Sequence, residues 1–133
     1  MQNSQDLNKV QELRNALVAS DESRVKAQRD AGKLTARQRI EKLVDAGSFV
    51  ELFALVSENG DAAGVVTGYA TVQSRPVYLF AQDFTVHGGA MGKLQAFKIN
   101  KVLDLALKTG APVIALCDSA GVRVDEGAAG MNA

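Results

Sequence analysis

This chain of 133 residues has one cysteine, one histidine and no tryptophan. The residue types that form disulfide cross-links or metal sites are therefore scarce. One Cys and one His cannot supply a tetrahedral zinc site, and a lone Cys cannot close an internal disulfide. A chain of this length buries roughly two-thirds of its unfolded surface, so it needs neither. We expect a hydrophobic core, no metal, and a reduced Cys117 that packs as a small buried hydrophobe at a strand end.

An excess of charge of one sign is also absent, because 15 Lys and Arg balance 15 Asp and Glu. Nucleic-acid binding requires basic side chains concentrated on one face, and no such face is visible. The longest apolar stretch, residues 112–117, is far shorter than the roughly 18 residues that indicate a membrane span. The polar start, MQNSQD, lacks a signal-peptide pattern. These absences predict a soluble, globular, cytoplasmic protein.

The first third of the chain has helical spacing. Apolar residues recur at intervals of three and four, as on one face of a helix, at Leu7, Val10, Leu13 and Leu17. This helix is expected to stop near Gly32. A second helix is expected from Thr35, which has capping-box spacing to Gln38, with Gly47 at its C-terminal stop.

From residue 49 onward the pattern favours β-strands. Apolar runs rich in β-formers predict strands at 49–56, 64–72 and 76–84. The last two form a predicted hairpin through residues 73–75, although these lack the Asn-Gly pair typical of a tight turn.

A second strand-helix-strand pattern follows. The glycine-rich stretch 87–92 opens a predicted helix that runs to about Lys108. The uninterrupted apolar run 113–117 predicts a strand covered on both faces, and the polar loop 118–127 follows its carboxyl end, where ligands of α/β sheets commonly bind. The order is α/β and looks unfinished, because such a strand needs further elements packed on it.

Two familiar catalytic or binding motifs are matched only in part. The stretch GGAMGK at 88–93 lacks the first glycine and the hydroxyl residue of a phosphate-binding loop, so its glycines are better explained by a tight turn. Ser119 follows a strand as in a nucleophile elbow, but Cys117 replaces the first glycine, and His87 is the one available imidazole. A hydrogen-bonded turn explains Ser119 more simply. The amides around Gly121 could still donate to an oxyanion without any side-chain nucleophile.

Six segments, taken in order, resemble the carboxyltransferase subunits of biotin-dependent acyl-CoA carboxylases and the related decarboxylase alpha chains. They are GKLTARQRI (32–40), GSFVEL (47–52), GVVTGY (64–69), AQDFTVHGG (81–89), KTGAPVI (108–114) and DSAGVR (118–123). The resemblance implies a crotonase-like spiral of strand-strand-helix units, incomplete here and preceded by N-terminal helices. Residues 1–47 would be a helical arm, and 48–133 the truncated first part of the N-terminal carboxyltransferase domain.

The resemblance also implies a reaction. A carboxyl group would move between carboxybiotin and the α-carbon of an acyl-CoA such as propionyl-CoA or acetyl-CoA, through an enolate held by backbone amides. Biotin would arrive on a biotin carboxyl carrier or biotin carboxylase partner, and members of the family assemble as hexamers. The alternatives are a biotin-dependent decarboxylase subunit, or a noncatalytic fragment or interaction module that needs a complementing chain. The chain alone is expected to be inactive.

The resemblance assigns the oxyanion donors to the turn after residue 118. The Gly121 amide is the expected donor and the Val122 amide the second choice, with Ser119 and Ala120 beside the substrate. The family's second donor would come from a later strand. The familiar turn DSGGARIQEG reads DSAGVRVDEG at 118–127, so a methyl group at Ala120 is expected to reshape the pocket while the Gly121 N–H remains.

The remaining expected substrate contacts lie in two other segments. Phe84, Gly88 and Gly89 are expected to line the thioester side of the pocket. Lys33 and Arg37 match basic residues of the family and could reach the CoA phosphates, although a solvated helix start is the simpler interpretation of both.

Overall fold

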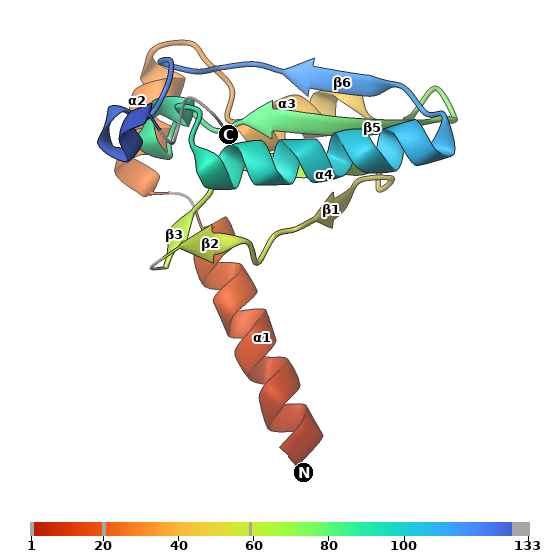
Figure 1. The fold of residues 1–133 in the computed structure, drawn as a ribbon, viewed down its shortest axis with the longest axis horizontal. Helices are drawn as coiled ribbons and strands as arrows, with labels where there is room; N and C mark the ends of the chain where they lie inside the picture. The colour runs from red at the N-terminus through yellow and green to blue at the C-terminus, as the bar shows by residue number, and fades with distance from the viewer. Residues whose placement is uncertain (1, 20, 59, 129–133) are drawn as a thin grey trace.

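The computed structural model describes residues 2–19, 21–58 and 60–128 (Figure 1). In the described residues, three helices are followed by five strands, and then by a fourth helix and a sixth strand. In chain order they are α1 (Gln2–Val18), α2 (Glu22–Asp30), α3 (Ala36–Leu43), β1 (Val50–Leu52), β2 (Ser57–Glu58), β3 (Asp61–Ala62), β4 (Val65–Val72), β5 (Arg75–Gln82), the 3₁₀ turn η1 (His87–Gly89), α4 (Lys93–Thr109), β6 (Val113–Leu116) and the 3₁₀ turn η2 (Val124–Glu126).

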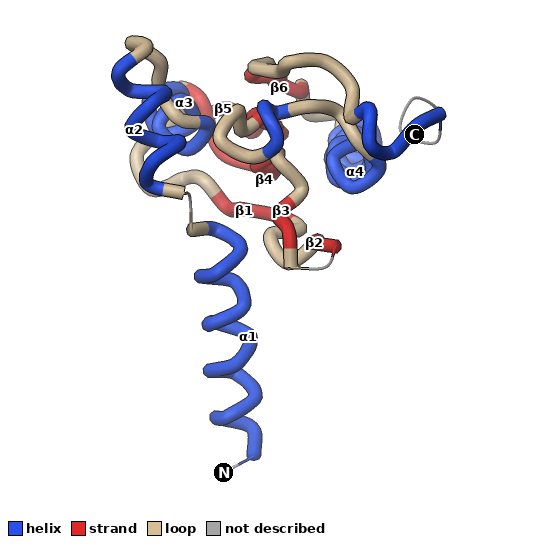
Figure 2. Tube along the Cα trace, turned by 90° about the vertical axis from the view of Figure 1, so that its left-hand side faces the viewer, coloured by secondary structure: helices blue, strands red, loops and turns tan. Residues whose placement is uncertain are grey.

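The main sheet has the order β1-β4-β5-β6. The pairs β1–β4 and β4–β5 are antiparallel, whereas β5 and β6 are parallel and are joined by a crossover through α4. Helices α3 and α4 lie on opposite sides of β4 and β5 (Figure 2). The chain thus forms the predicted α/β arrangement, a strand-strand-helix unit followed by the first strand of another.

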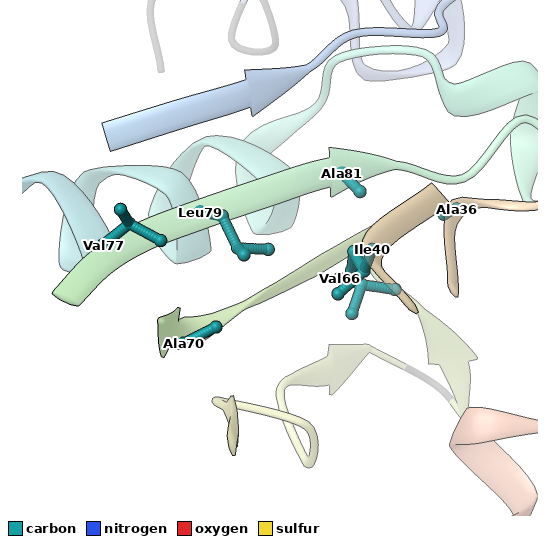
Figure 3. Packing of buried hydrophobic residues seen from close by; sticks show 7 residues of the cluster. All are labelled: Ala36, Ile40, Val66, Ala70, Val77, Leu79 and Ala81. Atoms are coloured by element: carbon teal, nitrogen blue, oxygen red, sulfur yellow. The ribbon is translucent and has the colours of Figure 1, made fainter. Parts of the chain in front are cut away.

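The main core cluster lies between α3 and the two long strands (Figure 3). Ile40 of α3 and Leu79 of β5 are almost completely buried, and Val66 and Val77 pack with them. The capping box at Thr35 and Gln38 is present and starts α3 at the predicted place. The helix ends at Leu43, before Gly47.

The predicted β4–β5 hairpin is confirmed, and its turn is held by an unexpected partner. Gln73 and Ser74 both have positive φ, at 50° and 63°, which non-glycine residues rarely adopt. The carboxylate of Asp45 accepts hydrogen bonds from both turn amides, at 2.9 and 2.8 Å, and from the Thr71 hydroxyl at 2.6 Å. These bonds compensate for the absence of an Asn-Gly pair.

The first predicted helix is wrong in its length, because two helices occupy that segment. Asp21 caps the N-terminus of α2, and its carboxylate accepts from the amides of Ser23 and Arg24. Asp at an N-cap favours a new helix start over continuation. Helix α1 projects from the body, so Leu7, Val10 and Leu13 of its predicted apolar face are exposed, whereas Leu17 is half-buried (Figures 1 and 2).

Two strand predictions also need correction. The run 49–56 contributes only the short β1, because Phe53 adopts φ +59° and ends it, and the small β2–β3 hairpin was not predicted. Strand β6 is half-buried rather than covered on both faces, and Cys117 is exposed, because α3 and α4 pack mainly on β4 and β5. Within the described residues, none of the helices combines the length and apolarity needed to cross a bilayer.

Candidate functional site

Two loops meet at the carboxyl ends of β5 and β6. These strands are parallel neighbours, so the loops that follow them emerge at the same edge of the sheet. The Ala120 amide donates to the Gly88 carbonyl at 2.9 Å, and the Met91 amide donates to the Gly121 carbonyl at 2.8 Å. The Arg123 amide returns to the Met91 carbonyl at 2.8 Å. The structure therefore brings together the two segments that were expected to line the pocket.

The glycines of the first loop permit this contact. Gly89 has φ +64°, and a Cβ there would lie 2.2 Å from the Asp118 carbonyl oxygen. Gly88 has φ +63°, and a Cβ there would lie 3.2 Å from the Ala120 methyl group. The glycine-rich stretch therefore serves a tight turn and a close approach of two backbones.

The turn at Ser119–Val122 carries the expected oxyanion donors. The Gly121 amide donates to Ser119 Oγ at 3.1 Å, and that hydroxyl also contacts the Gly121 carbonyl at 3.1 Å. No described residue accepts a hydrogen bond from the Val122 amide. Gly121 has φ +125°, whereas Ala120 is not among the described residues with positive φ, so alanine fits position 120 without backbone strain.

A side-chain cluster lies next to this turn. Lys33 Nζ is 2.6 Å from Asp118 Oδ1 and 4.5 Å from the centre of the Phe84 ring. A cavity of about 410 Å³ opens here, lined in part by Lys33, Phe84, Gly88 and Arg24. Arg24 donates to the Thr85 carbonyl at 3.0 Å and so ties α2 to the loop. The cavity combines an apolar wall with two cationic side chains.

Arg37 lies away from this cluster, so the structure does not bring Lys33 and Arg37 together. Its guanidinium forms two 3.0 Å hydrogen bonds to the Glu51 carboxylate of β1. It lines a separate cavity of about 30 Å³ together with buried Lys98. Burial lowers the pKa of Lys98 to about 8, and its Nζ donates to the Val65 carbonyl at 2.7 Å. The position of Arg37 fits a structural ion pair between α3 and β1.

Sequence reasoning missed a buried pair beneath the two loops. Gln82, at the end of β5, and Gln95, in α4, are 6% and 1% exposed. Gln82 Nε2 donates to Gln95 Oε1 at 2.9 Å, and Gln82 Oε1 accepts from the Asp118 amide at 3.1 Å. A signal existed, because Gln95 lies on the helical stripe of buried Ile99, a polar residue at an apolar position.

Other chemistries receive less support. Ser119 Oγ is hydrogen-bonded within its own turn, as the simpler interpretation of that residue expects. Across the described part of the chain, no group of three or more His, Cys, Asp or Glu side chains could hold a metal ion. The features that converge are backbone amides, an apolar wall and cations.

Comparisons with known proteins agree on the family. The model of the carboxyl transferase domain matches residues 27–133. The propionyl-CoA carboxylase beta chain of Cereibacter sphaeroides is 45% identical over 92% of this chain and 27% of its own length. The methylmalonyl-CoA decarboxylase subunit alpha of Veillonella parvula is 48% identical over 79% of this chain and 23% of its own length.

A solved structure is similar as well. Transcarboxylase 12S, described as a hexamer with methylmalonyl-coenzyme A bound, superposes with a TM-score of 0.86 at 36% identity, over 97% of this chain and 28% of its own. This likeness confirms the expected crotonase-like α/β fold. The chain spans about a quarter of the length of these relatives. Because the family model covers most of its residues, the chain belongs to the carboxyl transferase domain family.

Proposed function

We propose that this chain supplies the acyl-CoA face and one set of oxyanion donors of a biotin-dependent acyl-CoA carboxyltransferase. The observation that carries the proposal is the contact of the Ser119–Val122 turn with Gly88, through the Ala120 amide, because Gly88 lines a cavity with an apolar wall and a cationic rim. Propionyl-CoA and methylmalonyl-CoA are the proposed substrate pair, since relatives of both names are similar to the chain.

The turn would stabilise an enolate. Removal of a proton from the α-carbon of the thioester places negative charge on the thioester oxygen, and preorganised amides stabilise such an oxyanion by several kcal/mol. Gly121 can turn its N–H to the substrate when the Ser119 hydroxyl rotates away, and Val122 has an amide that no described residue uses. A second donor would come from residues outside this sequence.

The cavity would bind the coenzyme A portion. Phe84 and Gly88 offer an apolar surface, and Arg24 and Lys33 offer positive charge for phosphate groups. Lys33 would exchange its contact with Asp118 for one with phosphate. Arg37 is left out of this binding role because Glu51 already holds it.

The partners follow from the same proposal. Carboxybiotin on a carrier protein would supply the carboxyl group, and its site would lie on other residues than those of this chain. Assembly into a hexamer is proposed because transcarboxylase 12S is described as one. The cytoplasm is the proposed location.

A decarboxylase subunit is the second candidate, favoured by the 48% identity to the methylmalonyl-CoA decarboxylase subunit. The same amide turn would serve either reaction, because both pass through the enolate. A third candidate, an interaction module without catalysis, has support in the projecting helix α1, whose Leu7 is exposed.

The test begins with the intact mass of the protein from its native source, which establishes the full polypeptide to be assayed. That polypeptide is then mixed with propionyl-CoA and a carboxylated biotin carrier, and methylmalonyl-CoA is measured by mass spectrometry. Formation of methylmalonyl-CoA supports the carboxyltransferase. Release of propionyl-CoA from methylmalonyl-CoA only in the presence of a decarboxylase partner supports the second candidate. If neither reaction is detected, the result supports the interaction module.

A further inference from the structure

The strongest unassigned feature is a buried chain of amide groups, here called the amide relay. It consists of the side chains of Gln95 and Gln82 and the backbone N–H of Asp118. The relay connects helix α4 with the end of β5 and with the turn that carries the proposed oxyanion donors. Its side chains are at least nine-tenths buried.

The direction of every hydrogen bond in the relay is determined by its far end. Gln95 Nε2 faces the Gly64 and Gly89 carbonyls, at 3.0 and 3.2 Å, which can only accept. Gln95 Oε1 must therefore accept, and Gln82 must present its NH₂ group to it. The remaining Gln82 oxygen then faces the Asp118 N–H. The two amides cannot flip independently without placing like groups in contact.

The relay holds both loops of the site at once. Gln95 donates a hydrogen bond to the Gly89 carbonyl of the first loop, while Gln82 accepts one from the Asp118 amide at the start of the turn. The Gly88 carbonyl, next to Gly89, accepts from the Ala120 amide. The turn is thus anchored at 118 by the relay, at 120 by Gly88, and at the Gly121 carbonyl by Met91, whereas the amide of Gly121 bonds only to Ser119 within the turn.

We propose that Gln82 and Gln95 are positioning residues that aim the Gly121 and Val122 amides at the thioester oxygen. The expected effect on catalysis rests on the proposed function. The expected effect of the relay on the position of the turn does not. Neither side chain touches the cavity beside Lys33, so neither is proposed to bind substrate. Because amide side chains do not titrate, the relay would hold the turn equally well across the working pH range.

The test uses the intact protein that carries this chain, with three substitutions. Gln82→Met removes the relay at similar side-chain size, and Gln82→Glu keeps an oxygen for the Asp118 N–H but loses the donor to Gln95. Val102→Ala, a fully buried change on α4, is the control for general loss of stability. Backbone hydrogen exchange at residues 118–122 and steady-state carboxyl transfer are measured for each.

We expect Gln82→Met to speed exchange at 118–122 by about tenfold or more, and to lower kcat by about 10- to 100-fold with KM for acyl-CoA within about twofold. Gln82→Glu, which places an acceptor against Gln95 Oε1, should change both quantities in the same direction, and it replaces Gln82→Met if that variant does not fold. Val102→Ala should leave kcat and the exchange at 118–122 unchanged.

Equal exchange and equal kcat in the wild type and the Gln82 variants would overturn the inference. A fall in kcat that Val102→Ala reproduces would also overturn it, since the effect would then be general. A wild-type protein without carboxyl transfer contradicts the proposed function instead, and the exchange rates still decide whether the relay holds the turn.

Discussion

The molecule contains two tight turns that treat their backbone amides in opposite ways. In the β4–β5 hairpin, the carboxylate of Asp45 accepts from both exposed turn amides, at Gln73 and Ser74. In the 119–122 turn, Gly121 has only the neighbouring Ser119 hydroxyl, and no described residue uses the Val122 amide. The hairpin turn, which serves the fold, has its donors satisfied by a charged acceptor, whereas the turn that we propose to bind a ligand keeps the Val122 amide available.

The two turns also differ in how they are anchored to the rest of the molecule. The hairpin is stabilised locally by eight residue pairs between β4 and β5. The 119–122 turn depends on the 83–92 loop, on Gln82 and on the close approach at Gly89. Substitutions at these supporting residues should therefore affect the 119–122 turn and leave the hairpin turn unchanged.

The largest effect is expected from Gly89→Ala. The new methyl group would meet the Asp118 carbonyl at 2.2 Å in a residue with φ +64°, so the loops must separate. We expect the free energy of unfolding to fall by about 2–4 kcal/mol, measured by urea denaturation. Gly110→Ala is the control, because Gly110 has φ +69° but no atom within 4 Å of the added methyl. A similar loss of about 1 kcal/mol in both variants would show that the two loops are not in close contact.

The next effect distinguishes the two basic residues of the GKLTARQRI segment. Arg37→Met leaves the Glu51 carboxylate, which is 7% exposed, without its ion pair, so we expect a loss of about 2 kcal/mol in unfolding free energy. Lys33→Met breaks a more exposed pair and should cost no more than about 1 kcal/mol.

Acyl-CoA affinity should rank these two variants the other way. Lys33→Met should weaken binding by about five- to tenfold in calorimetric titration with propionyl-CoA, since it removes a cation from the cavity rim. Arg37→Met should leave the affinity of the folded protein nearly unchanged. Equal weakening by both would contradict the assignment of Lys33 alone to the cavity.

The hairpin turn should respond to acid. The hydrogen bond from Thr71 and those from the amides of Ser74 and Gln73 lower the pKa of Asp45 below its usual value. The contribution of the Asp45 carboxylate to stability is therefore present at neutral pH. It is lost as the pH falls below about 4 and through the lowered pKa. We expect Asp45→Asn to have a lower thermal midpoint than the wild type at pH 6 and a difference that shrinks toward pH 2.5. A difference that stays constant with pH would refute the charged cap.

The smallest effect on stability is expected from Ser119→Ala. Its hydroxyl bonds only within an exposed turn, so the unfolding free energy should change by less than about 0.5 kcal/mol. Hydrogen exchange of the Gly121 amide should rise several-fold, because its single acceptor is gone. An unchanged exchange rate would show that another group protects that amide.

The local features of the fold were predictable because neighbouring residues encode them. The capping box of α3 needs only Thr35 and Gln38, and the helix α4 stops where Gly110 adopts the left-handed conformation. The break between α1 and α2 was missed, although Asp21 is a good N-cap, because the apolar spacing fades after residue 20 and the first clear stop signal is Gly32. The short β1 was overextended because Phe53 gives no sign in sequence of its positive φ.

The sequence by itself determined the β4–β5–α4–β6 order, the glycine-rich loop, the amide-bearing turn and the family to which these segments belong. Only the tertiary structure decided which side chains meet there. Lys33 pairs with Asp118 across 85 residues, while Arg37, four residues later, pairs with Glu51. The buried contact of Gln82 with Gln95 is decided in the same way. Such choices depend on the direction of each side chain once helices pack on the sheet, and spacing along the chain does not contain that direction.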